Sequence, residues 1–88
     1  MDSILTIYNN GIKKWKNYKC QLHREGGPAI EYSDGSKVWY RNGQRHREDG
    51  PAIEHYNGLK MWYLNDIKYT EQEYKKKMRS MKIDSLNN

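Results

Sequence analysis

The chain has 88 residues, enough for one small domain, and it carries a net charge of +5 with 35% hydrophobic residues. It contains no phenylalanine, but eight tyrosines and three tryptophans supply large apolar rings, so we expect a thin aromatic core instead of a disordered chain. One cysteine excludes an internal disulfide, and the early apolar run at residues 4–8 is too short for an export signal or a membrane span. These features predict a cytoplasmic protein that does not associate with membranes.

An internal repeat with a period of 23 residues occupies the middle of the chain. Residues 23–31 and 46–54 agree at eight of nine positions. The same shift places Trp39 over Trp62 and continues through the glycines, lysines and asparagines around them. The repeat is therefore a duplication of a whole unit and not of one short motif.

A divergent copy precedes the two clear ones, because residues 10–15 match residues 57–62. It has one extra residue between Trp15 and His23, which predicts a bulge. The repeat ends at Asp66, which replaces a turn glycine. The predicted organisation is a single repeat domain over 1–83, with a degenerate hairpin over 1–21, copies over 22–44 and 45–67, a helix over about 71–82, and a flexible tail over 84–88.

Each copy has the sequence pattern of a β-hairpin. Residues 29–32 and 37–40 favour strands, and the Asp-Gly pair within residues 33–36 favours the turn between them. Asn42-Gly43 suits a second, two-residue turn of type I′. The fold class predicted is mainly β, an antiparallel meander of tandem β-hairpin repeats with period 23 and one C-terminal capping α-helix. Adjacent hairpins are expected to share one continuous twisted sheet.

The C-terminal segment changes to a helical pattern. Thr70 and Glu73 form a capping box, so a helix should start at residue 71. Tyr74, Met78 and Met81 then recur on one helical face. We expect this face to cover the otherwise open end of the sheet.

The repeated unit, His-Arg-Glu-(Asp/Gly)-Gly-Pro-Ala-Ile-Glu followed by glycine turns and Trp-Tyr pairs, resembles tandem repeats of small proteins from tailed phages and some large viruses. It is also similar in rhythm to MORN-type hairpin repeats, and the resemblance extends from about Asn10 to Met81. It implies a viral accessory or counter-defence protein that inhibits host machinery, in the host cytoplasm, and it implies no particular partner.

The repeated histidines and acids raise the question of a metal or acid/base site. His46, Glu48 and Asp49 are the residues that would form it. We favour a structural interpretation, in which arginines pair with acids of their own or a neighbouring copy and the imidazole caps a turn, because a metal site needs three or four convergent ligands. We predict no catalytic, metal or cofactor site. The structural repeat residues are His23, Arg24, Glu25, His46, Arg47, Glu48, Trp39 and Trp62.

Cys20 has two interpretations. Beside Lys19 and near His23 it could be an activated thiol. We favour a small, half-buried residue of a strand.

The aromatic residues also have two interpretations. The three tryptophans, with Tyr40 and Tyr63, could stack bases alongside the neighbouring lysines. Core packing is favoured, because the chain has so little aliphatic mass.

The charge is concentrated at the two ends of the chain. Residues 1–21 carry four lysines and one acid, residues 22–67 six basic and seven acidic residues, and residues 68–88 six basic and three acidic residues, giving +3, −1 and +3. The basic ends form one patch if the sheet curls and two if it stays extended. The candidate residues for binding a partner or a nucleic acid are Lys13, Lys14, Trp15, Lys16, Lys19, Lys75, Lys76, Lys77 and Arg79.

Our first hypothesis is a non-enzymatic inhibitor or adaptor that binds a host protein, with basic ends that speed encounter with an acidic partner. The alternative is a protein that binds RNA or another single-stranded nucleic acid. A repeat that follows a phosphate backbone should carry a basic excess in each copy, which these copies lack. Exposed sheet edges also make a homodimer an expected state.

Overall fold

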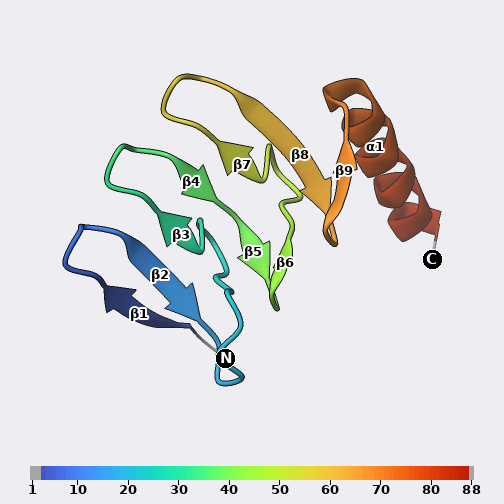
Figure 1. Cartoon of the computed structure of the whole chain (residues 1–88). Helices are drawn as coiled ribbons and strands as arrows, with labels where there is room; N and C mark the ends of the chain where they lie inside the picture. Colours follow the sequence, from blue (N-terminus) through green and yellow to red (C-terminus); the bar gives the residue numbers. More distant parts are fainter. Residues whose placement is uncertain (1–2, 88) are drawn as a thin grey trace.

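The computed structural model describes the backbone of residues 3–87 and the side chains of residues 3–82. The chain forms a seven-stranded antiparallel meander sheet with one C-terminal helix (Figure 1). In spatial order the strands are β1 (Ile4–Ile7), β2 (Lys13–Lys16), β3 (Ile30–Glu31), β4 (Lys37–Val38), β7 (Ile53–Glu54), β8 (Lys60–Leu64) and β9 (Ile67–Tyr69). A two-stranded ribbon of β5 (Tyr40–Arg41) and β6 (Gln44–Arg45) lies between β4 and β7 in the chain, and α1 (Glu71–Asn87) follows β9. The predicted mainly β meander with a C-terminal helix is confirmed.

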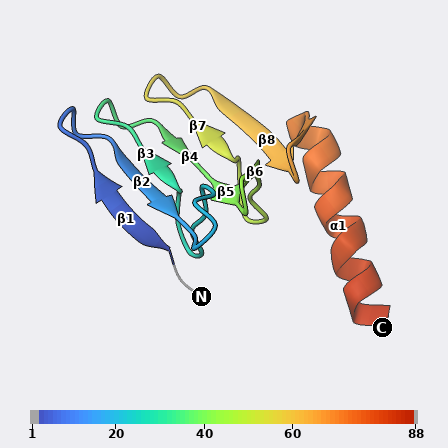
Figure 2. The ribbon, with the colours of Figure 1, turned by 60° about the horizontal axis from the view of Figure 1, so that its bottom comes forward.

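Three loops lie side by side at one rim of the sheet, where they join β1 to β2, β3 to β4 and β7 to β8 (Figures 1 and 2). In each loop a glycine N–H donates to the carbonyl three residues earlier, and the pairs are Gly11 to Tyr8 at 2.9 Å, Gly35 to Tyr32 at 3.0 Å and Gly58 to His55 at 2.9 Å. The φ angles of these glycines lie between +88° and +95°, a region that costs residues with a Cβ about 1–2 kcal/mol. These positive φ angles explain why a glycine stands in each of the three loops.

The opposite rim carries two-residue turns between β5 and β6 and between β8 and β9. Asn42 and Gly43 have φ angles of +51° and +83°, and Asn65 and Asp66 have +50° and +69°. Both turns have the paired positive φ angles of type I′. Asp66 tolerates the glycine position because its Oδ1 accepts hydrogen bonds from Arg45 N at 3.0 Å and Arg45 Nε at 2.7 Å.

Cys20 lies in the corresponding turn of the first copy, and the expectation of a half-buried strand residue is wrong. Cys20 is exposed and has a φ of +63°. Its N–H donates to Asn17 O at 2.9 Å, and Asn17 N donates to Gln21 O at 2.9 Å. The extra residue of this copy thus lengthens the turn to three loop residues, with a bulge residue in the left-handed region.

Replacing Cys20 with glycine should raise the free energy of unfolding by about 0.5–1 kcal/mol. Glycine removes a left-handed penalty of about 1–2 kcal/mol, and its extra freedom in the unfolded chain offsets part of that gain. Urea denaturation monitored by tryptophan fluorescence measures the difference. Cys20→Ser is the matched control, which keeps the Cβ and should leave stability unchanged; equal effects of the two variants would contradict the explanation.

The predicted strand over residues 37–40 is interrupted at Trp39. Trp39 N donates to Ala52 O at 2.7 Å, whereas Trp39 O accepts from His46 N at 3.1 Å. The chain therefore changes partner at this residue, from β7 to β6, and β4 and β5 are separate strands. In the last copy the equivalent segment stays continuous as β8 and pairs with both β7 and β9.

The buried core mixes alanine, aliphatic and tyrosine side chains, which are Ala29, Ile30, Val38, Ala52, Tyr63, Leu64 and Tyr74. Ala29 and Ala52 are 0% exposed, and the backbone N–H groups of Trp15 and Trp39 donate to their carbonyls. The three tryptophans are half-buried, so the expected aromatic core is formed by tyrosines together with aliphatic side chains.

The capping box at the start of α1 forms as predicted. Glu73 N donates to Thr70 Oγ1 at 3.1 Å, and Thr70 N donates to Glu73 Oε1 at 2.9 Å. The helix is longer than predicted: it continues to Asn87 instead of ending near residue 82, so residues 84–87 of the expected tail are helical. No glycine or proline follows Thr70 in the sequence to stop it. Asn88 lies outside the described residues.

Candidate functional site

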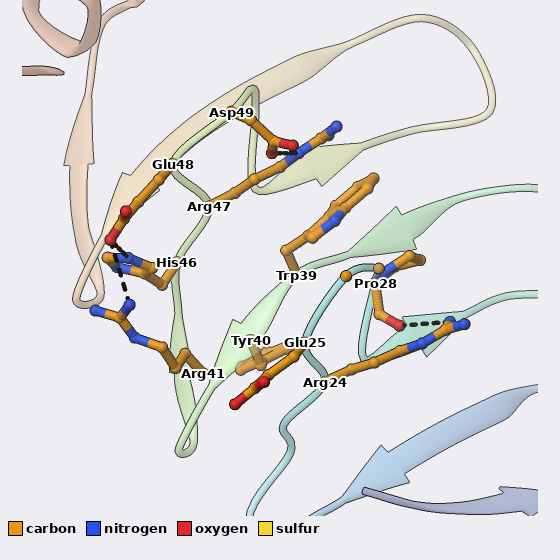
Figure 3. Close-up of a pocket in the computed structure, with 12 residues that line it drawn as sticks. Arg24, Glu25, Pro28, Trp39, Tyr40, Arg41, His46, Arg47, Glu48 and Asp49 are labelled. Carbon is orange, nitrogen blue, oxygen red and sulfur yellow. Dashed lines mark hydrogen bonds and ion pairs between the residues drawn. The ribbon is translucent and has the colours of Figure 1, made fainter. Parts of the chain in front are cut away.

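A cleft of about 450 Å³ lies between the two copies of the His-Arg-Glu motif (Figure 3). Residues 24–28 and 46–49 line it, together with residues 39–41. Its charged side chains are three arginines and three acids, which are Arg24, Arg41, Arg47, Glu25, Glu48 and Asp49.

Arg47 connects two successive hairpins across this cleft. Its guanidinium carbon lies 3.8 Å from the ring centroid of Trp39, which belongs to the preceding copy. Its Nη1 donates to Pro51 O at 3.0 Å and to Glu54 Oε2 at 2.8 Å, and its Nε donates to Asp49 Oδ1 at 2.8 Å. The side chain is only 18% exposed. Stacking and directed hydrogen bonds thus act together in one largely desolvated side chain.

Arg24 repeats this arrangement one copy earlier. Its guanidinium carbon lies 3.8 Å from the ring centroid of Trp15, and its Nη1 donates to Pro28 O at 3.2 Å and to Glu31 Oε2 at 3.3 Å. Gly26 stands where the second copy has Asp49. Arg24 is therefore held by longer hydrogen bonds than Arg47.

The repeated glycine of the Gly-Pro pair has a steric reason. A Cβ on Gly50 would come within 2.9 Å of Arg47 Cζ, and one on Gly27 within 3.0 Å of Arg24 Cζ. Neither glycine has a positive φ angle among the described backbone angles. Each glycine is needed because a guanidinium packs directly on its backbone.

Tyr74 of α1 lies beside Trp62, whereas arginines lie over the rings of the two earlier tryptophans. The two ring centroids are 6.5 Å apart with the planes tilted by 48°. The Tyr74 hydroxyl donates to Arg47 O at 2.6 Å and accepts from Gly50 N at 3.3 Å. Burial raises the pKa of this phenol above its ordinary value. The helix therefore closes the row of hairpins with an aromatic ring in place of a guanidinium.

Both repeated histidines are buried, and each fixes the turn of a neighbouring hairpin. His23 Nδ1 accepts from Asn42 N at 3.0 Å, and His46 Nδ1 accepts from Asn65 N at 3.0 Å. A ring nitrogen that accepts carries no proton, so the proton of the neutral imidazole is on Nε2.

The other nitrogen of His46 is engaged as well. Nε2 lies 2.8 Å from Glu48 Oε2, which also accepts from Arg41 Nη1 at 3.2 Å. The hydrogen bond to His46 is the main cause that lowers the pKa of Glu48 below its ordinary value, and Arg41 lowers it further. At His23 the corresponding distance, to Glu25 Oε2, is 3.8 Å.

The side chains considered as metal ligands face different partners. Glu48 binds His46, whereas the Asp49 carboxylate faces Arg47 Nε. Among the side chains of residues 3–82, no three of His, Cys, Asp or Glu form a group that could hold a metal ion. The residues present at the cleft do not fit a metal.

The basic candidates lie at two separate places. Lys13, Lys14 and Lys16 are on β2 near one end of the sheet, and Lys19 is in the turn that follows. The helical candidates are on α1 at the other end, along a molecule whose longest dimension is 47 Å (Figures 1 and 2). The helical candidates are Lys75, Lys76, Lys77 and Arg79. The structure therefore does not combine the basic ends into one patch.

The aromatic candidates are occupied by other side chains. Trp15 and Trp39 each hold an arginine at 3.8 Å, and Trp62 holds a tyrosine. Tyr63 is buried, with the Arg45 guanidinium carbon 4.3 Å from its ring centroid. These contacts use the ring surfaces that base stacking would need.

A ladder of alternating charge crosses the sheet, and sequence reasoning missed it. The register places Glu31 between Lys13 and Lys37, and Glu54 between Lys37 and Lys60. Directly opposed unlike charges stabilise neighbouring strands. The signal was present in the repeat, which recurs with a glutamate and a lysine in each copy.

Sequence reasoning also missed an exposed aromatic surface on the loop rim. We name it the tyrosine rim, and its residues are Tyr8, Tyr32, Tyr56 and Leu59, all exposed. Two contacts join adjacent loops: Tyr56 N donates to Ser36 Oγ at 3.0 Å, and a Cβ on Gly11 would lie 3.3 Å from Ser33 Cβ. The loop residues were interpreted only through their turn conformation, and the third loop has His55 where the first two have Tyr8 and Tyr32, with Tyr56 one residue later.

The chain was compared with protein-family models, with curated proteins and with solved structures, and none of them matches it. The expected viral origin therefore rests on the repeat motif. In the part of the chain that the structure describes, no helix has the length and apolar character needed to cross a membrane.

Proposed function

We propose that this chain is a non-enzymatic binding protein, built of tandem 23-residue hairpin repeats, that binds a host protein through the tyrosine rim. The observation that carries the proposal is the rim itself: three loops lie side by side (Figure 1), and each of them carries an exposed residue of the set Tyr8, Tyr32, Tyr56 and Leu59. Tyrosine supplies large contact area with few rotatable bonds and is enriched in binding interfaces.

The hairpins that carry the rim are fixed in relation to one another. Arg47 joins Trp39 to Glu54, and Ser36 joins two rim loops directly. A surface that is ordered before binding loses less conformational entropy when the partner arrives. This favours recognition of a folded protein by a rigid surface.

Equivalent contacts recur 23 residues apart, which supports the tandem-repeat interpretation. His23 binds Asn42 as His46 binds Asn65, and both distances are 3.0 Å. The two arginines stack on their tryptophans at the same distance of 3.8 Å. On this interpretation α1 is the cap of the array, as terminal units of repeat proteins often are.

The alternating charge ladder favours a protein partner over a phosphate backbone. Each lysine of the ladder lies opposite a glutamate, so the sheet beneath the rim has no sustained basic stripe. Phosphate contacts dominate nucleic-acid affinity and need such a stripe. The resemblance adds the biological setting: a phage or other viral accessory protein that acts as a counter-defence inhibitor in the host cytoplasm.

RNA binding is the second candidate, and one groove favours it. Lys68, Lys76 and Lys77 line a groove of about 470 Å³ between β9 and α1, together with Tyr69. Cations around an aromatic ring suit a single-stranded nucleic acid. The separation of this groove from the basic β2 limits the length of backbone that it can follow.

An affinity capture from host lysate, split into nuclease-treated and untreated halves, tests the proposal. We expect one specific protein in both halves. Recovery of RNA alone, or loss of the protein after nuclease treatment, would replace the proposal with nucleic-acid binding. Salt adds a second readout, because phosphate-driven binding falls steeply as salt rises.

A further inference from the structure

The edge strand β1 presents apolar side chains on both faces. Ile4 is 70% exposed, Leu5 43% and Ile7 61%. Of the described strands, β1 pairs with β2 alone. Natural edge strands usually carry lysine, proline or a bulge that blocks further pairing, and residues 4–7 contain neither of those residue types. β1 thus has the chemistry of a strand that is covered by another strand.

The hydrogen bonds of β2 show which groups of β1 remain free for pairing. Trp15 N donates to Ala29 O and Trp15 O accepts from His23 N, so the polar groups of Trp15 point away from β1. Leu5 is directly opposite Trp15, and in an antiparallel pair its N–H and C=O must then point outward. Because this orientation alternates along the strand, the backbone N–H and C=O of Ile7 also point outward, away from β2.

We propose that two copies of this chain associate by antiparallel pairing of β1 with β1, centred on Thr6 opposite Thr6 of the second copy. In this register Leu5 exchanges both backbone hydrogen bonds with Ile7 of the second copy, and the two-fold axis repeats the exchange. One face then joins the leucines and isoleucines of both copies, and the other places Ile4 beside Tyr8. The two sheets become one continuous sheet.

A second copy fits this edge because the strand is complementary to itself. Leu5 meets Ile7 on one face, Ile4 meets Tyr8 on the other, and β1 contains no charged residue that would repel its counterpart. Among the residues from Ser3 onward that the structure describes, the charges nearest the contact are those of Lys13, Lys14 and Lys16, one strand further in on each copy. They repel weakly across the junction, so salt should strengthen this association, whereas it weakens binding to nucleic acid.

The size of the contact sets its strength. One four-residue strand from each copy buries less than the roughly 800 Å² per partner of a standard stable interface. The dimer should therefore be in concentration-dependent exchange with the monomer. Analytical ultracentrifugation from about 10 μM to 1 mM covers the range in which such weak contacts are populated.

The first test compares two lysine substitutions in the full chain. Ile7→Lys should weaken the dimer about tenfold or more, since it places charges together at the junction. Ile67→Lys is the control, because Ile67 is similarly exposed at 59% but lies in β9 at the other end of the sheet. A monomer at all concentrations, or a dimer that Ile7→Lys leaves unchanged, would overturn the proposal.

The second test fixes the register and also works if the dimer is weak. Facing residues at a pair without backbone hydrogen bonds have Cα atoms about 4.5 Å apart, within the range of a disulfide. Thr6→Cys in a Cys20→Ser background should therefore give a covalent dimer under mild oxidation, and Thr70→Cys in the same background should not. Equal cross-linking of both variants would contradict the register. Substitutions of the rim residues Tyr56 and Leu59, which lie outside the β1 contact, should leave cross-linking unchanged whether or not the proposed function holds.

Discussion

Replacing Arg47 with alanine should lower the free energy of unfolding by about 3 kcal/mol. The stack on Trp39 contributes roughly 1–2 kcal/mol at this degree of burial, and the charge-assisted hydrogen bonds to Glu54 Oε2 and Pro51 O account for the rest. The ion pair with Asp49 adds little, because that carboxylate is 85% exposed. Urea denaturation measures the change.

Arg41→Ala is the matched control for this prediction. Arg41 is 48% exposed and pairs with Glu48, so its loss should cost less than about 1 kcal/mol. Arg47→Lys keeps the charge but loses the planar fork, and we expect it to resemble the alanine variant more than the wild type. If Arg47→Ala and Arg41→Ala cost the same, Arg47 does not hold the hairpins together.

Replacing Tyr74 with alanine should destabilise the protein by about 3–4 kcal/mol, the usual cost of deleting a buried aromatic ring. Tyr74 is 5% exposed, packs near Trp62 and donates to Arg47 O. Helices of this length are marginal when they are not packed against anything, so far-ultraviolet circular dichroism should also lose helical signal. Tyr74→Phe keeps the ring and should lose only the hydroxyl contribution of about 1 kcal/mol.

The hydroxyl also predicts an alkaline limit to stability. Burial raises the pKa of Tyr74 in the folded protein above 10.0. The contribution of the neutral phenol to the free energy of unfolding is therefore complete below pH 10, and it is lost as the pH rises through the pKa of the folded protein. In the Tyr74→Phe variant, the free energy of unfolding should fall less steeply as the pH rises above 10. Tyr40, whose pKa is raised mainly by burial, should account for a further part. An unchanged alkaline slope in Tyr74→Phe would show that the phenol is not buried against Arg47 in solution.

The sequence predicted the features that depend on neighbouring residues. Glycine and asparagine at fixed intervals specified the turns, because few other residues tolerate a positive φ there. The Thr70–Glu73 box specified the first turn of α1, since both of its hydrogen bonds are local. The end of the helix was not predictable in the same way, because no residue there acts as a stop signal.

Features that join distant segments were beyond the sequence. The repeat showed that arginine and tryptophan recur, but not that an arginine of one copy stacks on the tryptophan of the preceding copy. Trp39 looked like a strand residue because its exchange of partner from Ala52 to His46 depends on the register of two hairpins. The role of Tyr74 was hidden for a similar reason: a tyrosine on a helix has no sequence likeness to the arginine it replaces.

The candidate site changed most between sequence and structure. Basic residues at both ends suggested one binding patch, but the extended strand order keeps β2 and α1 apart. Three exposed tyrosines, Tyr8, Tyr32 and Tyr56, instead belong to three loops that lie side by side at one rim of the sheet (Figures 1 and 2).

The central claim is that the tyrosine rim binds a protein, and the most direct measurement is a nuclease-treated capture with three forms of the chain. These are the wild type, a rim variant with Tyr56→Ser and Leu59→Ser, and a basic-end variant with Lys16→Glu and Lys19→Glu. Lys14 is left unchanged, because its Nζ lies 5.3 Å from the ring centroid of the rim residue Tyr8. Both rim side chains are at least half exposed, so the fold should tolerate their loss. We predict that the wild type and the basic-end variant retain the same host protein and that the rim variant loses it. Retention by the rim variant together with loss by the basic-end variant would contradict the account.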